Sequence, residues 1–284
     1  MPLKYAVFVT PPIPQHSGTL NLPTGEPIAW SPTATTLIYG DRSAVLVDPP
    51  FTHSSVDDLL SWVEKFGLPV TGIYITHGHG DHWFGVSDVL KRYPEATVWA
   101  TAGTLAHLRD PAQVQQRAAF WDVLFPNEIP TEPFAVNVAD SSGFALEGHH
   151  LVPVEVGHSD TDDTTVLWVP ALRLAVAGDV VYNGVHLSLA ESGSGGRDAW
   201  RKALETVASL SPLIVVAGHK DPLHDDDPSH IDHTRQYLDD VDDQLIRSHT
   251  STEFFEAMVS LHPDRLNPGV LWVGANSLLT NSPS

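Results

Sequence analysis

The densest group of metal-binding side chains in this sequence lies in one short stretch, residues 77–82. It follows an apolar run, 70–75, and contains four candidate ligands: His77, His79, Asp81 and His82. Neutral imidazole nitrogens and carboxylate oxygens suit Zn²⁺ and related divalent metals. In an extended segment His77 and His79 point to the same side, and the intervening glycines let the backbone bend so that Asp81 and His82 face a second centre. The spacing therefore predicts two sets of ligands.

Three later candidates also follow apolar runs. The runs 151–156, 172–177 and 213–217 end at Gly157-His158, Gly178-Asp179 and Gly218-His219. In α/β sheets, sites form beyond strand ends, where loops bring distant side chains to one crevice. His149 and His150 compete with His158, which is preferred because it alone follows a strand and a glycine. The sequence thus supplies seven candidate ligands on one rim: His77, His79, Asp81, His82, His158, Asp179 and His219.

The elements that would position these residues alternate between strands and helices. The patterns predict strands at 4–10, 34–39, 43–47, 70–75, 97–100, 144–146, 151–156, 164–169, 172–177 and 213–217. They predict helices from 54 or 55 to about 67, and over 86–93, 101–109, 197–210, 228–248 and 252–261. No repeat or long linker is present, so we expect a single domain over residues 1–284, made of two similar α/β halves.

One apolar segment, 111–134, has two interpretations. Its aromatic and aliphatic residues, followed by Pro126 and Pro130, are typical of a helix and loop packed over something. The simpler interpretation is a core helix. The alternative is a wall or lid over a substrate pocket.

Composition excludes several classes of partner. The chain has 35 acidic and 15 basic side chains and a formal net charge of −20, which argues against nucleic acid or an anionic membrane as partner. Cysteine is absent, so no thiolate can serve as a ligand or nucleophile. The N-terminal apolar run is interrupted by Pro11, Pro12 and Pro14 and does not read as a signal peptide, so a cytoplasmic location is the expectation.

The order of the motifs resembles the metallo-β-lactamase superfamily of binuclear metal hydrolases, from about Asp48 to His219. The resemblance implies an α/β fold, a four-layer αββα sandwich. It also implies one metal ion on His77, His79 and His158, a second on Asp81, His82 and His219, and Asp179 as the bridge. A bridging carboxylate also supplies negative charge that imidazoles lack. Asp48 matches an acid that supports the site without binding a metal ion.

Two divalent metal ions, with Zn²⁺ as the first expectation, imply hydrolysis. At a separation of about 3.5–4 Å they would lower the pKa of a shared water toward neutrality, and the resulting hydroxide would attack a carbonyl carbon. Asp81 would pass a proton to the leaving group. Tyr182 follows Asp179 at the offset at which similar lactonases place a Tyr, so it is the expected oxyanion donor; the alternative is a Tyr packed on the rim. Trp83 and Phe84 are predicted to form an aromatic wall for the substrate.

The favoured reaction is ring opening of a cyclic ester or cyclic amide, by a lactonase or lactamase-like enzyme. Without cysteine, the β-lactamase subclasses that use a Cys ligand do not fit. A thioesterase of the glyoxalase II type would need basic residues to grip glutathione, whereas Lys220 is followed by Asp221 and 225–227. Segment 179–191 would line the pocket, through Tyr182, Asn183, His186 and Ser188.

A different class of chemistry stays open. Iron-dependent persulfide dioxygenase-like members leave the second metal site unused, and flavodiiron members replace the second His with Glu, where this chain has His79. A metal-binding protein without catalysis is less favoured because no ligand is missing. The expected partner is a small-molecule substrate, without nucleic acid or membrane, and a homodimer is left open.

Overall fold

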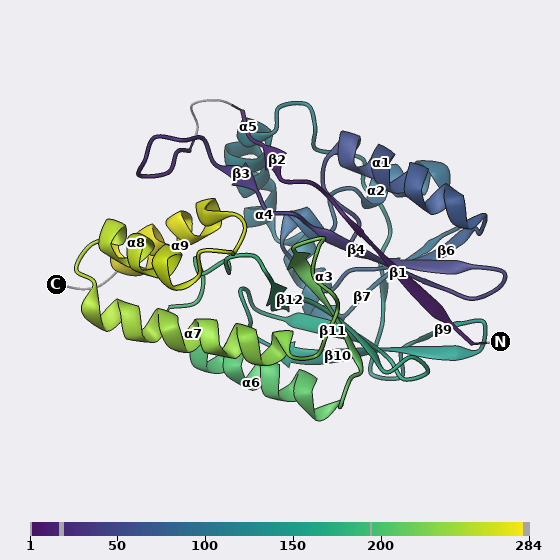
Figure 1. The fold of residues 1–284 in the computed structure, drawn as a ribbon. Helices are drawn as coiled ribbons and strands as arrows, with labels where there is room; N and C mark the ends of the chain where they lie inside the picture. The colour runs from purple at the N-terminus through teal and green to yellow at the C-terminus, as the bar shows by residue number, and fades with distance from the viewer. Residues whose placement is uncertain (1, 17–19, 194, 281–284) are drawn as a thin grey trace.

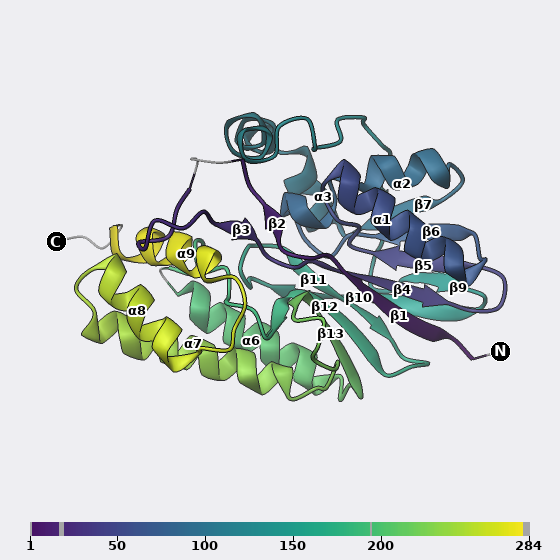
Figure 2. The same cartoon turned by 45° about the horizontal axis from the view of Figure 1, so that its top comes forward.

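The computed structural model describes residues 2–16, 20–193 and 195–280, without the side chains of residues 113, 114 and 280. Two sheets face each other in the middle of the molecule, and helices cover their outer faces (Figure 1, Figure 2). Among the described residues, no helix is both long enough and apolar enough to cross a bilayer.

The first sheet has six strands in the order β1-β4-β5-β6-β7-β8. These are β1 Lys4–Val9, β4 Ala34–Tyr39, β5 Ala44–Val47, β6 Val70–Tyr74, β7 Thr97–Ala100 and β8 Asn137–Val138. Pairing is antiparallel through β1, β4 and β5, and parallel from β5 to β8. The carboxyl ends of β5, β6 and β7 therefore meet at one edge, and residue 76 onward leaves the sheet there.

The second sheet has the order β13-β12-β11-β10-β9. Its strands are β9 Phe144–Leu146, β10 His149–Gly157, β11 Thr164–Val169, β12 Leu174–Asn183 and β13 Ile214–Lys220. A separate pair, β2 Ile13–Pro14 and β3 Ala29–Trp30, is antiparallel. The predicted hairpin between β11 and β12 is confirmed by their antiparallel register.

Two strands run further than predicted. β12 extends to Asn183 and β13 to Lys220, so Asp179 and His219 lie within strands and not beyond their ends. The β12–β13 register shifts between Val176 and Gly178 and again between Gly178 and Tyr182. These irregularities let a strand turn a side chain away from the regular alternation, which is how a mid-strand residue reaches the site.

Helices pack outside both sheets. The first sheet is covered by α1 His53–Val63, continued by η1 Glu64–Phe66, and by α2 Val86–Arg92 and α3 Ala102–Arg109. The second is covered by α6 Gly196–Ser209 and α7 His230–Arg247, with α8 Ser251–Leu261 and α9 Pro268–Thr280 beside them (Figure 2). The short helices η2 Gly80–His82, α4 Pro111–Gln116, η3 Arg117–Trp121 and α5 Asp122–Leu124 lie nearer the site. Helix α9 follows the last predicted helix and was not anticipated.

Strand alternation explains the layers. In β4, Leu37 packs with α1 residues such as Leu59, whereas its neighbour Ile38 faces Leu167 of the second sheet. In β12, Val176 joins this central layer, and Ala175 packs with the helices on the other side. Successive strand residues point to opposite faces, so both sheets bury both faces. The predicted four-layer αββα sandwich is confirmed.

Candidate metal centre

One group of candidate ligands is Asp81, His82 and His219, whose facing atoms lie within 4.8 Å of one another. Nε2 of His219 is 3.3 Å from Oδ2 of Asp81 and 3.2 Å from Oδ2 of Asp179. Nε2 of His82 is 3.2 Å from Oδ1 of Asp179. None of these three atom pairs has the alignment of a hydrogen bond. The atoms therefore face a common space between the side chains and do not point at each other.

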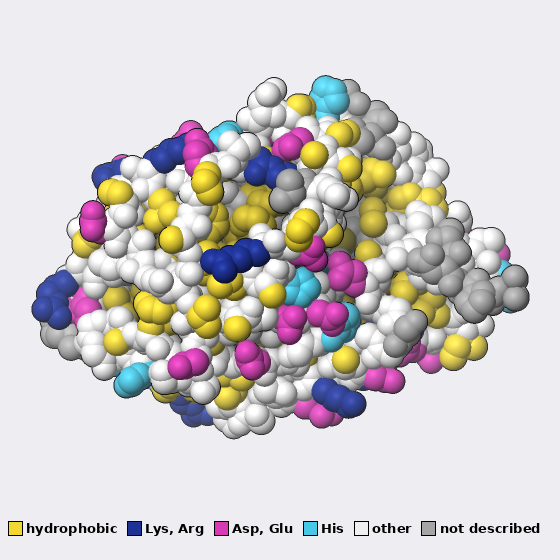
Figure 3. All heavy atoms as spheres, turned by 180° about the vertical axis from the view of Figure 1, so that it is seen from behind, with side chains coloured by type: hydrophobic (Ala, Val, Ile, Leu, Met, Phe, Trp, Pro, Cys, Tyr) yellow, Lys and Arg dark blue, Asp and Glu magenta, His cyan; other side chains and the backbone are white. Residues whose placement is uncertain are grey.

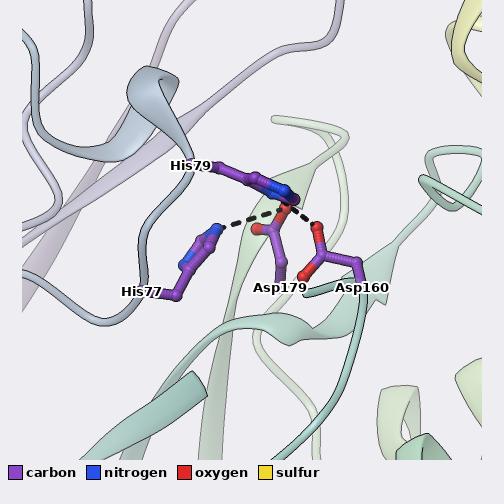
Figure 4. Close-up of side chains that lie close together, drawn as sticks. All are labelled: His77, His79, Asp160 and Asp179. Carbon is purple, nitrogen blue, oxygen red and sulfur yellow. Dashed lines mark ion pairs between the residues drawn. The ribbon is translucent and has the colours of Figure 1, made fainter. Parts of the chain in front are cut away.

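A second group contains His77, His79, Asp160 and Asp179. Figure 4 shows the four side chains pointing toward one another from three separate segments. Nε2 of His77 is 4.0 Å from Oδ2 of Asp179, and Nδ1 of His79 is 2.9 Å from Oδ2 of Asp160. Asp179 lies between the two groups, where a bridging carboxylate would have to be.

Close backbone approach brings these residues together. Gly178 has a φ of 50°, which lets β12 bulge beside the site. A side chain at Gly218 would overlap the carboxylate of Asp179. The two glycines therefore allow β12 and β13 to place Asp179 and His219 side by side.

Outer hydrogen bonds orient the imidazoles. The hydroxyl of Thr76 donates to Oδ2 of Asp48 at 2.6 Å and lies 2.9 Å from Nδ1 of His77. Since that hydroxyl's hydrogen goes to Asp48, Nδ1–H of His77 must donate, which leaves the Nε2 lone pair facing the site. His219 is fixed likewise, by Nδ1–H donating to the carbonyl of Pro32 at 2.9 Å. Asp48 also accepts from the Thr76 backbone N–H, as expected of a supporting acid.

Several buried atoms in these groups have no hydrogen-bond partner. Among the described residues they include Nε2 of His77, both ring nitrogens of His82, Oδ2 of Asp160 and Oδ1 of Asp179. Buried polar atoms are rarely left without a partner unless an ion or water satisfies them. The donor set of imidazoles and carboxylates also matches Zn²⁺ or a related divalent ion. The residues present therefore fit metal ions.

Mutual electrostatics keep the carboxylates ionised. Burial raises the pKa of Asp179, but His219 and His82 outweigh it and lower that pKa well below its usual range. Conversely, burial lowers the pKa of His219, but Asp179 and Asp81 outweigh it and raise that pKa to about 10. Burial and His82 lower the pKa of His77 to about 4, so His77 is neutral near pH 7. Metal binding would replace the proton on His219.

A third group, Asp48, His77 and His82, overlaps these two, and the structure brings His158 into none of the three. Its Nδ1 lies 2.7 Å from Oδ1 of Asp162, and its Nε2 is buried near Gly196 without a hydrogen-bond partner. The prediction that His158 binds a metal ion remains a prediction. Asp160, two residues later, lies in one group with His77, His79 and Asp179.

A cavity of about 310 Å³ opens over both groups. Its floor includes His79, Asp81, Asp179 and His219. Its walls are largely apolar: Leu20, Ile28, Trp30, Phe120, Trp121, Leu124, Val270 and Val273. Most of these come from β3, η3, α5 and α9, whereas Leu20 and Ile28 lie in the connection before β3. On the face opposite to Figure 1, acidic and histidine side chains gather near the centre, beside exposed hydrophobic ones (Figure 3).

The aromatic wall predicted from Trp83 and Phe84 was wrong. Neither residue lines the cavity, because the Trp83 indole turns back to donate to the carbonyl of Gly78 at 3.0 Å, and Phe84 is buried beneath. Trp30 and Trp121, with centroids 4.6 Å apart, supply that wall. Segment 111–134 thus fits both interpretations, since Trp121 and Leu124 belong to a core cluster and also line the cavity.

Segment 179–191 lines the cavity only in part. The residues that do so are Asp179, Tyr182, Ser188, Ala190 and Glu191, whereas Asn183 and His186 are buried away from it. Asn183 donates to the carbonyl of Asp225 at 2.7 Å, and His186 lies 2.8 Å from the hydroxyl of Tyr237.

Tyr182 is a buried wall residue whose hydroxyl donates to Oδ2 of Asp179 at 2.9 Å. Burial and Asp179 raise its pKa well above the usual range, so the phenol stays protonated. It lies where an oxyanion donor was predicted, and its proton is directed at a candidate ligand. The role itself stays a prediction.

Residues 28–219 match the family model of the metallo-β-lactamase superfamily, well over half of the chain. The chain belongs to the metallo-β-lactamase superfamily. This confirms the resemblance drawn from the motifs. Metallo-β-lactamase superfamily proteins are mostly metal-dependent hydrolases, and the His and Asp clusters of this member could bind metal ions.

The proteins similar to this chain say more about its fold than about its substrate. Over 69 residues, the chain is 32% identical to the hydroxyacylglutathione hydrolase of Buchnera aphidicola, covering 24% of this chain and 26% of that relative. The match thus spans about a quarter of that relative's length. A metallo-β-lactamase family protein from Thermus thermophilus has a similar structure, with a TM-score of 0.62, 17% identity, and coverage of 95% and 91%. Another is the metallo-β-lactamase FIM-1 from Pseudomonas aeruginosa in its mono-zinc form, with a TM-score of 0.55, 17% identity, and coverage of 84% and 91%.

Two residues of the site were missed from sequence. Asp160 lies in an acidic run with Asp162 and Asp163, which reads as an ordinary polar loop. The sequence feature that could have identified it is its distance from the next strand. Asp160 lies four residues before β11 begins, so the turn between them is short. Trp30 had no sequence signal, because its indole N–H donates at 2.9 Å to Asp81, 51 positions away.

Proposed function

We propose that this chain is a two-metal hydrolase that opens the ring of a cyclic ester or cyclic amide on a neutral, partly apolar substrate. Two features support it together: two adjacent groups of metal ligands, and a cavity above them with apolar walls. The cavity, of about 310 Å³, is large enough for a small molecule.

In this proposal, Asp81, His82 and His219 hold one ion, His77 and His79 help hold the other, and Asp179 lies between them. Bound divalent ions supply Lewis acidity toward a carbonyl oxygen and toward water. The protein's part is orientation. Trp30 donates to Oδ2 of Asp81, the oxygen that faces His82 and His219, so the other carboxylate oxygen is the one that exchanges a proton with the leaving group.

The charges of the side chains that line the cavity are the basis for proposing a neutral substrate. Among the described lining residues there is no Lys or Arg, and Glu191 lies at the rim with Oε2 accepting from Thr161 at 2.9 Å. Away from the metal ions, a substrate carboxylate would meet Asp160 and Glu191 without a Lys or Arg partner, and unpaired charge is costly to desolvate. A neutral ring with an apolar substituent avoids that cost and packs on Trp30 and Trp121.

The same observation separates this function from that of the relatives matched in sequence. Hydroxyacylglutathione hydrolases act, by name, on a glutathione thioester, and glutathione carries carboxylates. Carboxylate recognition generally uses Arg or Lys. The described walls offer neither, so a thioesterase of that type is less favoured.

A substrate panel tests the proposal. The purified protein is assayed with neutral lactones and lactams bearing alkyl or aryl groups, with carboxylated analogues, and with a hydroxyacylglutathione thioester. We expect kcat/KM for the neutral lactone to exceed that for its carboxylated analogue by ~10-fold or more, the equivalent of about 1.4 kcal/mol. Faster hydrolysis of the glutathione thioester would contradict the proposal.

The binuclear requirement needs its own controls. Asp179→Ala and His82→Ala each remove a ligand from the centre and should abolish hydrolysis of the lactone. Asp239→Ala is a matched control, because Asp239 pairs with Arg201 on the outer helices, remote in sequence from every ligand. Full activity of either ligand variant would refute a two-metal mechanism.

One observation favours a second candidate. His77, His79 and Asp160 together form a set of two imidazoles and one carboxylate, the arrangement of non-haem iron oxygenases. An iron-dependent oxidoreductase is therefore the alternative. Metal analysis decides between them: two ions per chain support hydrolysis, and one iron with O₂ consumption supports oxidation.

A further inference from the structure

Glu191 is a cavity-lining carboxylate that also contacts a candidate metal ligand. It lies in the segment that follows β12, and its Oε1 accepts a hydrogen bond from Nε2 of His79 at 3.3 Å. Its other oxygen, Oε2, accepts from the hydroxyl of Thr161 at 2.9 Å. We propose that Glu191 is a positioning residue of the metal centre, which orients His79 without binding an ion itself.

The direction of this hydrogen bond fixes the tautomer of His79. Because the Thr161 hydroxyl donates to it, the Glu191 carboxylate accepts at both oxygens, and the proton between Oε1 and Nε2 belongs to the imidazole. A neutral imidazole protonated at Nε2 has its lone pair at Nδ1. Nδ1 faces Asp160 at 2.9 Å, in the group that also contains Asp179 (Figure 4). The nitrogen that is free to bind an ion therefore points into the centre.

Asp160 is a competing acceptor on the opposite side of the ring. Its Oδ2 is buried without a hydrogen-bond partner and is the atom that lies 2.9 Å from Nδ1 of His79. If Nδ1 carried the proton, a small rotation of the ring would let it donate to this carboxylate, and Nδ1 could not bind a metal ion. A carboxylate on the Nε2 side offsets that preference, because charged acceptors form stronger hydrogen bonds than neutral ones. Glu191 thus keeps Nδ1 available.

Contacts from separate segments hold Glu191 in place. Thr161, which donates to Oε2, is itself buried in the loop between β10 and β11. The carbonyl of Ala190 accepts from the hydroxyl of Ser277 in α9 at 2.7 Å, and Leu189 is fully buried. About half of the Glu191 side chain, 52%, is exposed, yet both of its oxygens are hydrogen-bonded. The position of the carboxylate is therefore defined by the fold and does not depend on a bound ion.

Zinc binding by two variants at this position tests the role of the hydrogen bond. Glu191→Gln retains an oxygen that accepts from Nε2 of His79 and an amide that can donate to the Thr161 hydroxyl, whereas Glu191→Ala retains neither. Full-length wild type and both variants are stripped of metal, reloaded with Zn²⁺ and titrated with a chelator. We expect Glu191→Ala to lose about 10–100-fold in zinc affinity, as for other outer partners of metal-binding histidines, and Glu191→Gln to recover most of that loss. Glu205→Ala, at an exposed position of α6, is the matched control and should bind zinc like wild type.

A second measurement reports on the hydrogen bond itself. In the zinc-loaded protein, the Nε2–H proton of His79 should give an NMR signal that is protected from exchange with water in wild type and Glu191→Gln. In Glu191→Ala the same proton should exchange rapidly. Zinc affinity of Glu191→Ala equal to that of wild type, or equal losses in Glu191→Gln and Glu191→Ala, would overturn the proposal.

The inference rests on the metal centre of the proposed function, but its measurements need no substrate. If the zinc affinities change as expected and no lactone is hydrolysed by wild type, the substrate proposal fails and the role of Glu191 stands. If lactones are hydrolysed and zinc affinity does not depend on Glu191, the proposed function stands and this inference fails.

Discussion

At the scale of single residues, the site depends on side chains that touch the candidate ligands as much as on the ligands themselves. Thr76 joins Asp48 to His77, Pro32 fixes His219, and Trp30 holds Asp81. Each contact sets which atom of a ligand faces the centre. Such partners are expected to affect metal affinity even though they bind no metal ion.

Trp30 offers a direct test of this idea. Trp30→Phe keeps an aromatic ring in the cluster but removes the N–H that donates to Oδ2 of Asp81. We expect the affinity of the Asp81–His82–His219 group for Zn²⁺ to fall by roughly 10–100-fold, measured by chelator competition. Trp121→Phe is the control, because it alters a neighbouring ring of the same cluster. Equal losses in both variants would mean that packing, and not the N–H, is responsible.

Thr76 tests the outer network through stability. Thr76→Val has nearly the same shape but leaves a buried carboxylate of Asp48 and the Nδ1–H of His77 without their shared partner. Leaving buried polar groups unpaired costs about 1–3 kcal/mol, so the free energy of unfolding should fall by that amount in a denaturant titration.

The conservative variant provides the comparison for this loss. Thr76→Ser keeps the hydroxyl and removes only a methyl group, so it should retain most of the stability that Thr76→Val loses. A Ser variant as unstable as the Val variant would indicate that the methyl group matters more than the hydrogen bonds.

At the scale of elements, the substrate walls are built by segments outside the two sheets. β3 contributes Trp30, the helices from 111 to 124 contribute Phe120 and Trp121, and α9 contributes Val270 and Val273. The metal ligands come mainly from the sheets and the loops next to them. Substrate preference can therefore change without disturbing the centre.

A substitution in η3 tests this separation. Phe120→Ala removes a partly exposed ring from the cavity wall, so KM for a lactone with an apolar substituent should rise by about 10-fold while kcat changes little, since burial of such a ring contributes on the order of 1–3 kcal/mol. Val123→Ala, on the exposed side of the same segment, should leave KM unchanged. A fall in kcat without a rise in KM would contradict the assignment of Phe120 to the wall.

The elements also show how far sequence can lead. The alternation of strands and helices, the αββα layers and the first ligand stretch follow from local patterns, because strand and helix periodicities are local properties. The continuation of β12 past Gly178 does not follow from local patterns, because the sequence of a bulged strand resembles that of a turn. The position of Asp160 beside His77 and His79 depends on the conformation of a short loop. That conformation is set by hydroxyl contacts of Ser159 and Thr164, which the spacing of residues in the sequence does not predict.

At the scale of the whole molecule, a buried histidine connects acid stability with the packing of the C-terminal helices. His186 follows β12, and its Nδ1 lies 2.8 Å from the hydroxyl of Tyr237 on α7. Arg265 stacks over the Tyr237 ring at 4.7 Å and donates to the carbonyl of Val185. The segment leaving the site is thereby tied to both α7 and the connection between α8 and α9.

This arrangement gives a pH dependence with a defined sign. Burial, with Arg265 and His262 adding to it, lowers the pKa of His186 from 6.5 to about 3. Between these values the unfolded chain binds a proton that the folded chain does not. The stability contributed by neutral His186 is therefore fully present above pH 6.5 and is lost as the pH falls toward 3, at up to ~1.4 kcal/mol per pH unit.

His186→Gln removes this titration while keeping a polar side chain that can bond to the Tyr237 hydroxyl. The variant should be less stable than wild type near pH 7, because its packing is changed, but its free energy of unfolding should fall less steeply between about pH 6 and pH 4. Denaturant titrations at several pH values measure the slope. His249→Gln is the control, since His249 is exposed and its side chain stays in water in both states. Carboxylates elsewhere in the chain titrate equally in all three proteins, so only the difference in slope between them reports on His186. Equal slopes for wild type and His186→Gln would show that this histidine is not buried in its neutral form.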